Sequence, residues 1–432
     1  MSVSKKEAVV TGMGVITPLG DGVTENWEGL KSLKTGIARY DLEGLPDFLR
    51  YLGKVRGPVV DKDIPHKLLG QMKFLNRGSV LGFAAAREAL SLARLNLADI
   101  DPGRRALYIA SGDTTNVGYD FMYPATREGT HGRWQVIDQE RLNRSTLDKV
   151  NPFFLLESIN NNLFSFLSAY MEFMGPNTSL ASHSPCGGNA LELACRSIRQ
   201  NTADVAMAVG CGNWITEIPL FELEGLGILS QCRDGVNSFR PFDRRRDGFI
   251  PGEGGAALLL EASDYAEKRG AEILAEVKGY GNSIEYLSDC GITVPTHVIH
   301  ASMVTALGDA LCSPEDLAFI SPHGSGSQKG DRSEMRSVMK LFHDAVPPVP
   351  VCGMKAYTGH LGAASDIAEI IFGIKAVQDR IVPATLHFQM NEKEFEGYMI
   401  SDSHQECKGD HFLSVSYGIG GQSSSLVVRV VA

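Results

Sequence analysis

A cysteine stands between a proline and two glycines in the stretch SHSPCGGNALELACR, residues 182–196. Pro185 fixes its own backbone φ, and the two glycines permit a sharp reversal of the chain. The apolar residues that follow have helical spacing, so Cys186 is predicted to lie at the N-terminus of a helix. Unpaired amides and the helix dipole there favour a thiolate and could also hold an oxyanion. Cys186 is therefore a candidate nucleophile, and the alternative is a buried cysteine in a tight turn.

Two histidines far along the chain are candidate bases. His323 lies in SPHGSGSQKGDRSE, residues 321–334, and His360 lies in VPVCGMKAYTGHLGAAS, residues 349–365. Each follows a short apolar run that reads as a strand, and α/β folds build their sites at strand ends. A single histidine of this kind is more often structural. Three loops that supply one thiol and two imidazoles favour a shared catalytic site.

The elements that would carry these loops alternate between strands and helices, which predicts an α/β fold with mostly parallel sheets. Two βα series are visible, and we expect an N-terminal half over residues 1–265 and a C-terminal half over 266–432. The sequence between them has no Gly/Ser- or Pro-rich linker, so the halves are expected to share a core. The predicted strands lie within 7–15, 105–112, 203–212, 254–262, 273–284, 317–326 and 411–431, and the predicted helices within 79–95, 187–200, 263–270, 300–311 and 366–380.

Composition bounds the possible functions. The chain has 432 residues, of which 43% are hydrophobic, enough for a large core. A net charge of −10 without a strongly basic block argues against a general nucleic-acid binder. No apolar run approaches the ~20 residues that span a bilayer, and no signal sequence is evident. The eight cysteines contain no CxxC pair, which argues against a zinc site or a disulfide framework. We expect a cytoplasmic protein without a metal, a membrane anchor or a nucleic-acid partner.

The motifs taken together are more specific than any one of them. In chain order, these motifs are VVTGMGVITPLG, the cysteine turn, LGILSQCRDGVNSFRPFDRRRDGFIPGEGGAALLLE, HGSGSQKGD, KAYTGHLGAAS and SYGIGGQSSSLVV. With them the chain resembles the elongating β-ketoacyl-acyl carrier protein synthases of the thiolase superfamily. The resemblance runs nearly end to end. It implies a thiolase-like fold in which two fused βα halves form αβαβα layers.

The resemblance also implies roles for individual residues. Cys186 matches the nucleophile that takes the acyl chain from a phosphopantetheine thioester. His323 and His360 match the pair that acts on the malonyl extender, and the sequence leaves open which is donor and which is base. Lys355 matches an invariant lysine and Glu334 an acid placed eleven residues after the first histidine. A buried ion pair is expected to hold these loops in register and tune the histidines.

Further positions match the substrate channel. The amide of Tyr417 is expected to contribute to an oxyanion hole, and the glycine-rich turn after it to form a gate beside the acyl pocket. Two serines stand where the family usually has threonines that contact the pantetheine arm. The oxyanion and gate residues are Tyr417, Gly418, Ile419, Gly420 and Gly421, and the pantetheine-binding residues are Ser325 and Ser327.

The chain departs from the family pattern at several of these places. Ser184-Pro185-Cys186-Gly187-Gly188 replaces the usual threonine-alanine-cysteine followed by small hydroxyl residues. Tyr417 replaces phenylalanine, and Asp366 occupies a place that usually holds glycine. These changes put the pocket shape and the substrate in doubt. They are compatible with a specialised polyketide or polyene synthase.

The implied reaction is the decarboxylative Claisen condensation of an acyl chain with malonyl-acyl carrier protein, in fatty-acid or polyketide biosynthesis, with no cofactor. The implied partner is an acidic acyl carrier protein, for which Lys62, Lys67, Lys73 and Arg77 are the candidate docking residues, or else a solvated helix face. Family members dimerise by sheet extension, and residues 203–212 are a candidate edge strand or an internal one. The alternatives are a non-catalytic, chain-length-setting subunit of a heterodimer, which usually lacks the nucleophile, and a thiolase, which uses a second active-site cysteine late in the chain, where the segment SYGIGGQ has none.

Overall fold

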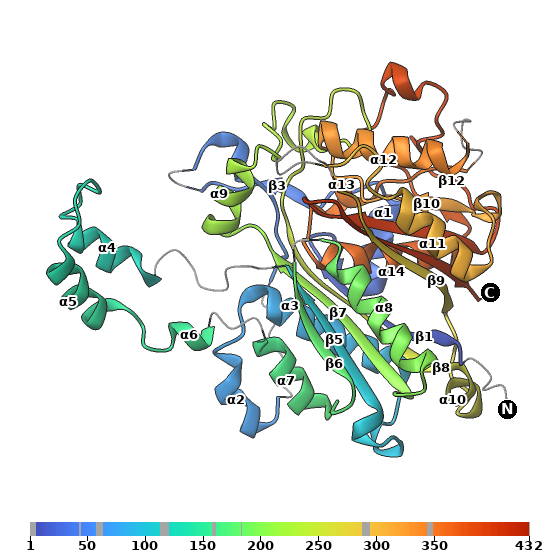
Figure 1. Cartoon of the computed structure of the whole chain (residues 1–432), viewed down its shortest axis with the longest axis horizontal. Helices are drawn as coiled ribbons and strands as arrows, with labels where there is room; N and C mark the ends of the chain where they lie inside the picture. The colour runs from blue at the N-terminus through green and yellow to red at the C-terminus, as the bar shows by residue number, and fades with distance from the viewer. Residues whose placement is uncertain are drawn as a thin grey trace.

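A large mixed sheet between layers of helices organises the chain (Figure 1). The computed structural model describes residues 6–42, 45–57, 64–112, 121–157, 161–182, 184–286, 294–343 and 349–431. The strand order is β10-β13-β14-β9-β1-β8-β7-β5-β6, with β2 paired to β1. The bounds are β1 Ala8–Thr17, β2 Gly20–Asp21, β5 Arg105–Ser111, β6 Asn177–Ala181, β7 Val205–Asn213, β8 Glu253–Ala262, β9 Ala275–Ile284, β10 Phe319–Ser321, β13 His411–Tyr417 and β14 Gln422–Val430.

The two βα series meet in the middle of this sheet. Strands β1, β8, β7, β5 and β6 come from the first series, and β9, β14, β13 and β10 come from the second. They join where Val9 and Val10 of β1 pair antiparallel with Glu276 and Ala275 of β9. The predicted division at 265/266 falls inside α10, Ser263–Lys268, and it stays a prediction.

Helices cover the sheet in the layers that the sequence predicts. Helix α3, Arg77–Ala93, packs on β1, β8 and β7, and α11, His300–Ala310, packs on β9 and β14. Helices α8, Cys186–Arg199, and α14, Ala364–Gln378, lie in the centre and contact strands of both series. Helix α12, Gln328–Leu341, contacts α11 on the outer side. The predicted αβαβα architecture is confirmed.

The expectation of mostly parallel sheets is wrong. In the described part of the large sheet, β5 pairs parallel with β6 and β7, and β10 pairs parallel with β13. The pairs β1–β2, β1–β8, β1–β9, β7–β8, β13–β14 and β14–β9 are antiparallel. Two long strands of the C-terminal half are joined by a short glycine turn, and such a hairpin forces an antiparallel pair.

The candidate edge strand is internal. Strand β7, which covers most of residues 203–212, pairs with β5 on one side and β8 on the other. Among the described strands, β6 ends the sheet and pairs only with β5. A fully buried apolar run is typical of a central strand, whereas β6 is partly exposed along its length.

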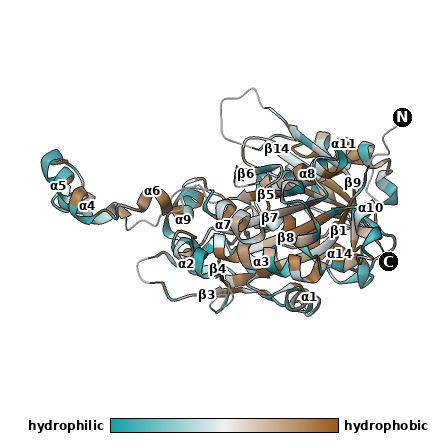
Figure 2. Cartoon of the chain, turned by 90° about the horizontal axis from the view of Figure 1, so that it is seen from below, coloured by the Kyte–Doolittle hydropathy of each residue, from teal (hydrophilic) through white to brown (hydrophobic). Residues whose placement is uncertain are grey.

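Three helices that the sequence analysis did not predict form an arm, residues 121–157. Helices α4, Tyr123–Gly129, α5, Gln139–Lys149, and α6, Phe154–Glu157, extend away from the body (Figures 1 and 2). The arm carries large exposed apolar side chains: Trp134, Val136, Ile137, Leu147, Phe153 and Leu156. A single exposed apolar residue needs no explanation, but a group of this size does.

The remaining helices are α1 Val23–Lys31, α2 His66–Met72, α7 Asn162–Met171, α9 Glu217–Gly225 and α13 Lys355–Thr358, and the remaining strands are β3 Ile37–Arg39, β4 Tyr51–Gly53, β11 Ile381–Val382 and β12 Gln405–Glu406. Over the residues that the structure describes, none of the helices combines the length and apolar character needed to cross a bilayer.

Glycine pairs let each outer helix approach its strand closely. A Cβ on Gly12 or Gly14 of β1 would lie 2.1 or 2.0 Å from a carbonyl oxygen of α3. In the second half, a Cβ on Gly279 or Gly281 of β9 would lie 2.2 or 2.3 Å from a carbonyl oxygen of α11. The same device at matching places in the two series explains the alternating glycines in TGMGV and KGYGN.

Substituting one of these glycines tests the packing. We expect Gly281→Ala to lower the free energy of unfolding by about 2–4 kcal/mol, because the new Cβ meets the backbone of α11. Gly308→Ala, in α11 itself, meets nothing within 4 Å and should not destabilise the chain. Urea unfolding of both variants is the measurement. Equal effects of the two substitutions would contradict the close approach.

Candidate active site

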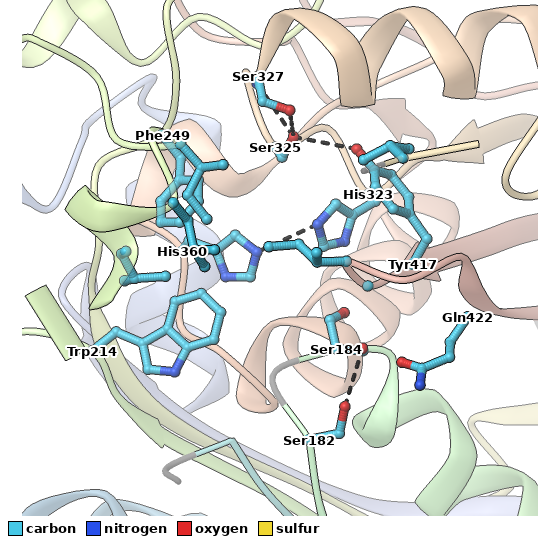
Figure 3. A pocket seen from close by; sticks show the side chains of 16 residues that line it. Ser182, Ser184, Trp214, Phe249, His323, Ser325, Ser327, His360, Tyr417 and Gln422 are labelled. Carbon is cyan, nitrogen blue, oxygen red and sulfur yellow. Dashed lines mark hydrogen bonds between the residues drawn. The ribbon is translucent and has the colours of Figure 1, made fainter. Parts of the chain in front are cut away.

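One cavity brings the predicted histidines together (Figure 3). It lies where loops after β6, β7 and β10 meet α9 and the turn between β13 and β14. Its described lining residues are Ser182, Ser184, Trp214, Leu223, Leu226, Ile228, Phe249, Val294, His323, Ser325, Ser327, His360, Tyr417, Gly418, Ile419 and Gln422.

The two imidazoles face each other. Their Nε2 atoms are 3.4 Å apart, and the amide of Gly362 donates to Nδ1 of His360 over 3.2 Å. A neutral His360 must therefore carry its proton on Nε2, as assigned from this hydrogen bond. That proton points at Nε2 of His323, which has to accept it with a lone pair. His360 is thus built as a donor and His323 as an acceptor.

The environment keeps His323 neutral. It is 4% exposed, and its pKa lies well below the usual value, first because of burial and then because of Lys355 and His360. Desolvation and a nearby cation both disfavour the imidazolium. His323 therefore offers a lone pair across the physiological pH range.

Aromatic rings hold the imidazoles in place. Trp214 stacks on His360 with ring centroids 4.5 Å apart, and Phe249 lies 4.9 Å from the same ring. Tyr417 lies 4.5 Å from His323. The sequence analysis missed Trp214 and Phe249. Their position just after β7 and just before β8 is the signal that could have found them.

Lys355 is a buried structural cation. Its Nζ lies 2.9 and 2.8 Å from the two carboxylate oxygens of Glu369 on α14, and it is 1% exposed. Burial raises the pKa of Glu369 to about 7, and Lys355 works against that rise. The expected buried ion pair is therefore present, but its acid is Glu369 on α14 and not the predicted Glu334 on α12.

Glu334 orients the His323 loop instead. Its two carboxylate oxygens accept the amides of His323, over 2.6 Å, and of Gly324, over 2.9 Å. Burial, and then the neighbouring Asp331, raise the pKa of Glu334 to about 8. Glu334 therefore fixes the backbone that carries the first histidine.

Cys186 is not among the described lining residues of the cavity, although Ser182 and Ser184 of the same turn are, and its role as nucleophile stays a prediction. It is 2% exposed, and its Sγ lies 2.7 Å from the carbonyl oxygen of Ser182, four residues earlier. Helix α8 begins at Cys186 itself, and a helical side chain tilts back toward the N-terminus of its helix. The thiol therefore points back along its own chain, toward Ser182.

The predicted lowering of the thiol pKa is also wrong in direction. Burial, and then the charge of Asp366, raise the pKa of Cys186 well above its usual value. The Asp366 carboxylate accepts the amides of Gly187 and Gly188 over 3.1 and 3.3 Å. The anion expected at this helix start is therefore a carboxylate, which occupies the amides that would have stabilised a thiolate.

Ser184, two residues before α8, is in the same turn as the thiol. It lines the cavity, is 4% exposed, and in Figure 3 its hydroxyl points toward the two imidazoles. The carbonyl oxygen of Ser184 touches the hairpin turn, since a Cβ on Gly418 would lie 2.1 Å from it. The loop residue two places before the helix thus faces the reaction space.

The departures in the channel form one hydrogen-bond group. The Tyr417 hydroxyl lies 3.3 Å from the Ser325 hydroxyl, which lies 2.8 Å from that of Ser327. A Cβ on Gly330 would lie 2.1 Å from the Tyr417 hydroxyl, so the extra phenol oxygen fills a space at the start of α12. Ser325 and Ser327 line the cavity as expected for pantetheine contacts, and that role stays a prediction.

The gating role of the glycine-rich turn after Tyr417 stays a prediction as well. Ile419 is 39% exposed and lines both the main cavity and an adjoining one, with Gly420 and Gly421 at positive φ beside it. The amide of Gly418 is used by the carbonyl oxygen of Gln422.

The role of the predicted docking residues stays a prediction. Lys62 lies outside the described residues, and Lys67 is exposed on α2. Lys73 lies over the rings of Phe74 and Phe153, and Arg77 contacts the buried Glu253 at 3.2 Å.

Comparisons with known proteins agree with this arrangement. Residues 5–266 match the model of the β-ketoacyl synthase N-terminal domain, and residues 274–389 match that of the C-terminal domain. A 3-oxoacyl-[acyl-carrier-protein] synthase 2 of Coxiella burnetii is 28% identical over 99% of each chain, and one of Staphylococcus aureus is 27% identical over 98% of each. A chain in a structure of a type II polyketide synthase acyl carrier protein in complex with its hexaketide-bound ketosynthase is 25% identical, with a TM-score of 0.83 over 99% of this chain and 100% of that one. A β-ketoacyl synthase of Burkholderia phymatum has the same TM-score at 23% identity, with the same coverage, and so shares the fold.

The fold and the histidine pair define a thiolase-fold condensing enzyme. The chain belongs to the β-ketoacyl synthase family. The predicted family, fold and enzyme class are thereby confirmed.

Removing one partner of the buried Lys355–Glu369 ion pair should lower the free energy of unfolding by a measurable amount. Lys355→Met should lower the free energy of unfolding by about 3–5 kcal/mol, because it leaves Glu369 buried without its cation. Replacing both residues with methionine should recover most of that loss. The partly exposed pair Arg336–Glu394 is the control, and Arg336→Met should cost about 1 kcal/mol or less. Denaturant titration measures all three, and a loss from Lys355→Met no larger than the control would contradict the buried pair.

Proposed function

We propose that this chain catalyses the decarboxylative condensation of an acyl chain with malonyl-acyl carrier protein to give a β-ketoacyl-acyl carrier protein. The observation that carries the proposal is the facing histidine pair in a cavity, with one imidazole fixed as donor and the other as acceptor. The curated relatives with this reaction in their names support it.

The malonyl half of the reaction uses the histidines. Loss of carbon dioxide leaves the bonding electrons on the α-carbon as an enolate, whose oxygen needs a donor fixed in advance. Nε2–H of His360 is such a donor, held by the Gly362 amide and by the Trp214 stack. The aromatic walls also exclude water that would protonate the enolate. No step requires a cofactor.

The acyl carrier protein is the proposed donor of both substrates. A second cavity shares Leu226, Ile228, Val294, Ser327 and Ile419 with the first and forms a path on which a pantetheine arm would pass Ser325 and Ser327. The exposed Lys329 lines this second cavity and adds a cation near its mouth. The acyl chain belongs to fatty-acid or polyketide biosynthesis, and we place the enzyme in the cytoplasm.

A homodimer is the proposed assembly. Strand β6 ends the described sheet with one unpaired side, and the arm carries a group of exposed apolar side chains near the same end of the molecule in Figure 1. An unpaired edge and an apolar patch both favour a second copy.

The arm provides the test of the dimer. The purified chain should sediment at twice its mass, and replacing Val136, Ile137 and Leu147 with serine should yield monomer, because their apolar surface would no longer be buried. Leu311→Ser, at an exposed leucine 94% accessible in the other half, is the control. Analytical ultracentrifugation distinguishes the species. A wild-type monomer would contradict the assembly.

A second candidate function is favoured by one observation. Cys186 is not among the described residues that line the cavity, and its Sγ contacts the carbonyl oxygen of Ser182. A subunit that decarboxylates or shapes the channel, while a related chain supplies the thiol, would have this arrangement.

The histidine roles predict separable losses. His360→Ala should lower the decarboxylation rate of malonyl-acyl carrier protein by about 10²–10³-fold, because the fixed donor to the enolate is gone. His387→Ala, at a half-buried histidine outside the cavity, is the control and should retain the rate. Release of labelled carbon dioxide is the readout. Unimpaired decarboxylation in His360→Ala would remove it from the mechanism.

A further inference from the structure

Three hydroxyls lie together where the two cavities meet (Figure 3). Ser325, Ser327 and Tyr417 all line the main cavity, and of these three only Ser327 also belongs to the described lining of the adjoining one. Ser325 and Tyr417 are buried. Buried hydroxyls need hydrogen-bond partners in the protein, so the donors and acceptors of this group can be counted.

A carboxylate that only accepts hydrogen bonds fixes the proton of Ser325. Asp331 is buried on α12 and receives the amides of Phe242 and Gly326 over 2.7 and 3.0 Å. Its Oδ2 also lies 3.4 Å from Nε of Arg246. The Ser325 hydroxyl lies 3.3 Å from Oδ1 of this carboxylate. Ser325 therefore donates its one hydroxyl proton to Asp331.

Ser325 is then left with one acceptor position for two neighbouring hydroxyls. The amide of Ser327 takes the first of its two lone pairs, over 3.2 Å. The hydroxyl oxygens of Ser327, at 2.8 Å, and of Tyr417, at 3.3 Å, are both within reach of the second. Because one lone pair accepts one proton, only one of these two hydroxyls can donate to Ser325 at a time.

Ser327 is the hydroxyl that a ligand entering through the adjoining cavity would meet first. Its oxygen accepts the amide of Gly330 over 3.3 Å, so its proton is the group that can turn to a ligand. When the proton turns, the lone pair that it leaves on Ser325 is open to the Tyr417 hydroxyl. A phenylalanine at this position would leave the same buried lone pair without a donor, which costs free energy.

We propose that the Tyr417 hydroxyl is a positioning group for the pantetheine arm of the carrier protein. It takes the place of Ser327 as the donor to Ser325, and so frees the Ser327 proton for an amide carbonyl oxygen of the arm. This inference rests on the proposed condensation and adds a residue to its substrate channel. The ligand is a carbonyl because the freed group is a donor. It is an amide of the arm because Ser327 lies on the side of the adjoining cavity, whereas the thioester belongs beside the histidines.

Gly330 provides the space for this exchange of donors. A Cβ at Gly330 would lie 2.1 Å from the Tyr417 hydroxyl oxygen and 2.4 Å from that of Ser327. The phenol oxygen therefore occupies the volume that a side chain would need at the first turn of α12. Strand β13 and helix α12 together hold the three hydroxyls in contact.

Removing one oxygen atom tests the role of Tyr417. Tyr417→Phe should raise KM for malonyl-acyl carrier protein about 3–10-fold, with the larger part of the loss in KM and the smaller part in kcat, because binding now leaves a lone pair unpaired. Carbon dioxide release is the readout. Tyr398→Phe is the matched control, since it removes a phenol hydroxyl that donates to Met335 of α12 outside the cavity, and it should keep KM. An unchanged KM in Tyr417→Phe overturns the proposal.

A double-mutant cycle tests whether Tyr417 acts through Ser327. In Ser327→Ala the donor to the arm is gone, so adding Tyr417→Phe should change KM by less than about 1.5-fold, whereas independent effects would multiply. Ser327→Thr keeps the hydroxyl and should keep KM near the wild-type value. Effects of the two substitutions that multiply contradict the inference.

Two small thioesters test the class of ligand. Malonyl-pantetheine carries the amide carbonyls of the arm, and the malonyl thioester of ethanethiol carries none of them. Tyr417→Phe should raise KM for the first and leave KM for the second unchanged. An equal rise for both thioesters rules out an amide carbonyl as the partner of Ser327.

Binding without turnover separates this inference from the proposed condensation. Calorimetric titration with holo- and apo-acyl carrier protein measures the contribution of the arm, and Tyr417→Phe should reduce that contribution by the same factor as it raises KM. If the wild type binds the arm in this way but releases no carbon dioxide, the proposed condensation fails and the inference holds. If carbon dioxide is released but Tyr417→Phe binds the arm as tightly as the wild type does, the inference fails alone.

Discussion

The contact on which the active site depends is that between the Asp366 carboxylate and the first amides of α8. It joins the two central helices at the point where both begin, and glycine makes the approach possible. A Cβ on Gly187 would lie 2.5 Å from the Ala363 carbonyl oxygen and 2.9 Å from the Asp366 Cβ. Because α8 starts here, Cys186 falls inside the helix and Ser184 remains in the loop that faces the cavity.

The buried carboxyls around this contact and His323 contribute to the stability of the fold with opposite dependence on pH. Burial raises the pKa of Asp366, Glu369 and Glu334 to about 6, 7 and 8. Their stabilising contribution is complete below their unfolded pKa values and is lost as the pH rises through the folded ones. His323 has a lowered pKa, so its contribution is present above the unfolded value and is lost as the pH falls below it. These opposite contributions overlap near neutral pH, where Lys355 stabilises the ionised form of Glu369.

Much of this arrangement follows from the sequence. Each predicted strand and helix exists, and the order of motifs predicted the fold and the histidine cavity. The failures have a common cause, which is that sequence spacing does not give direction. Whether the thiol or the hydroxyl two residues earlier faces the cavity depends on where α8 begins. Lys355 has several buried acids within reach of its loop, and only the path of α14 selects Glu369. Parallel and antiparallel neighbours likewise depend on connections in space.

The departures from the family pattern make sense as pairs. The phenol oxygen of Tyr417 needs space and a partner, which Gly330 and Ser325 supply. The Asp366 carboxylate accepts the Gly187 and Gly188 amides at the start of α8, and its charge, after burial, raises the pKa of the Cys186 thiol. Asp366 and the glycines at the start of α8 are thus matched to each other, because a Cβ on Gly187 would lie 2.9 Å from the Asp366 Cβ.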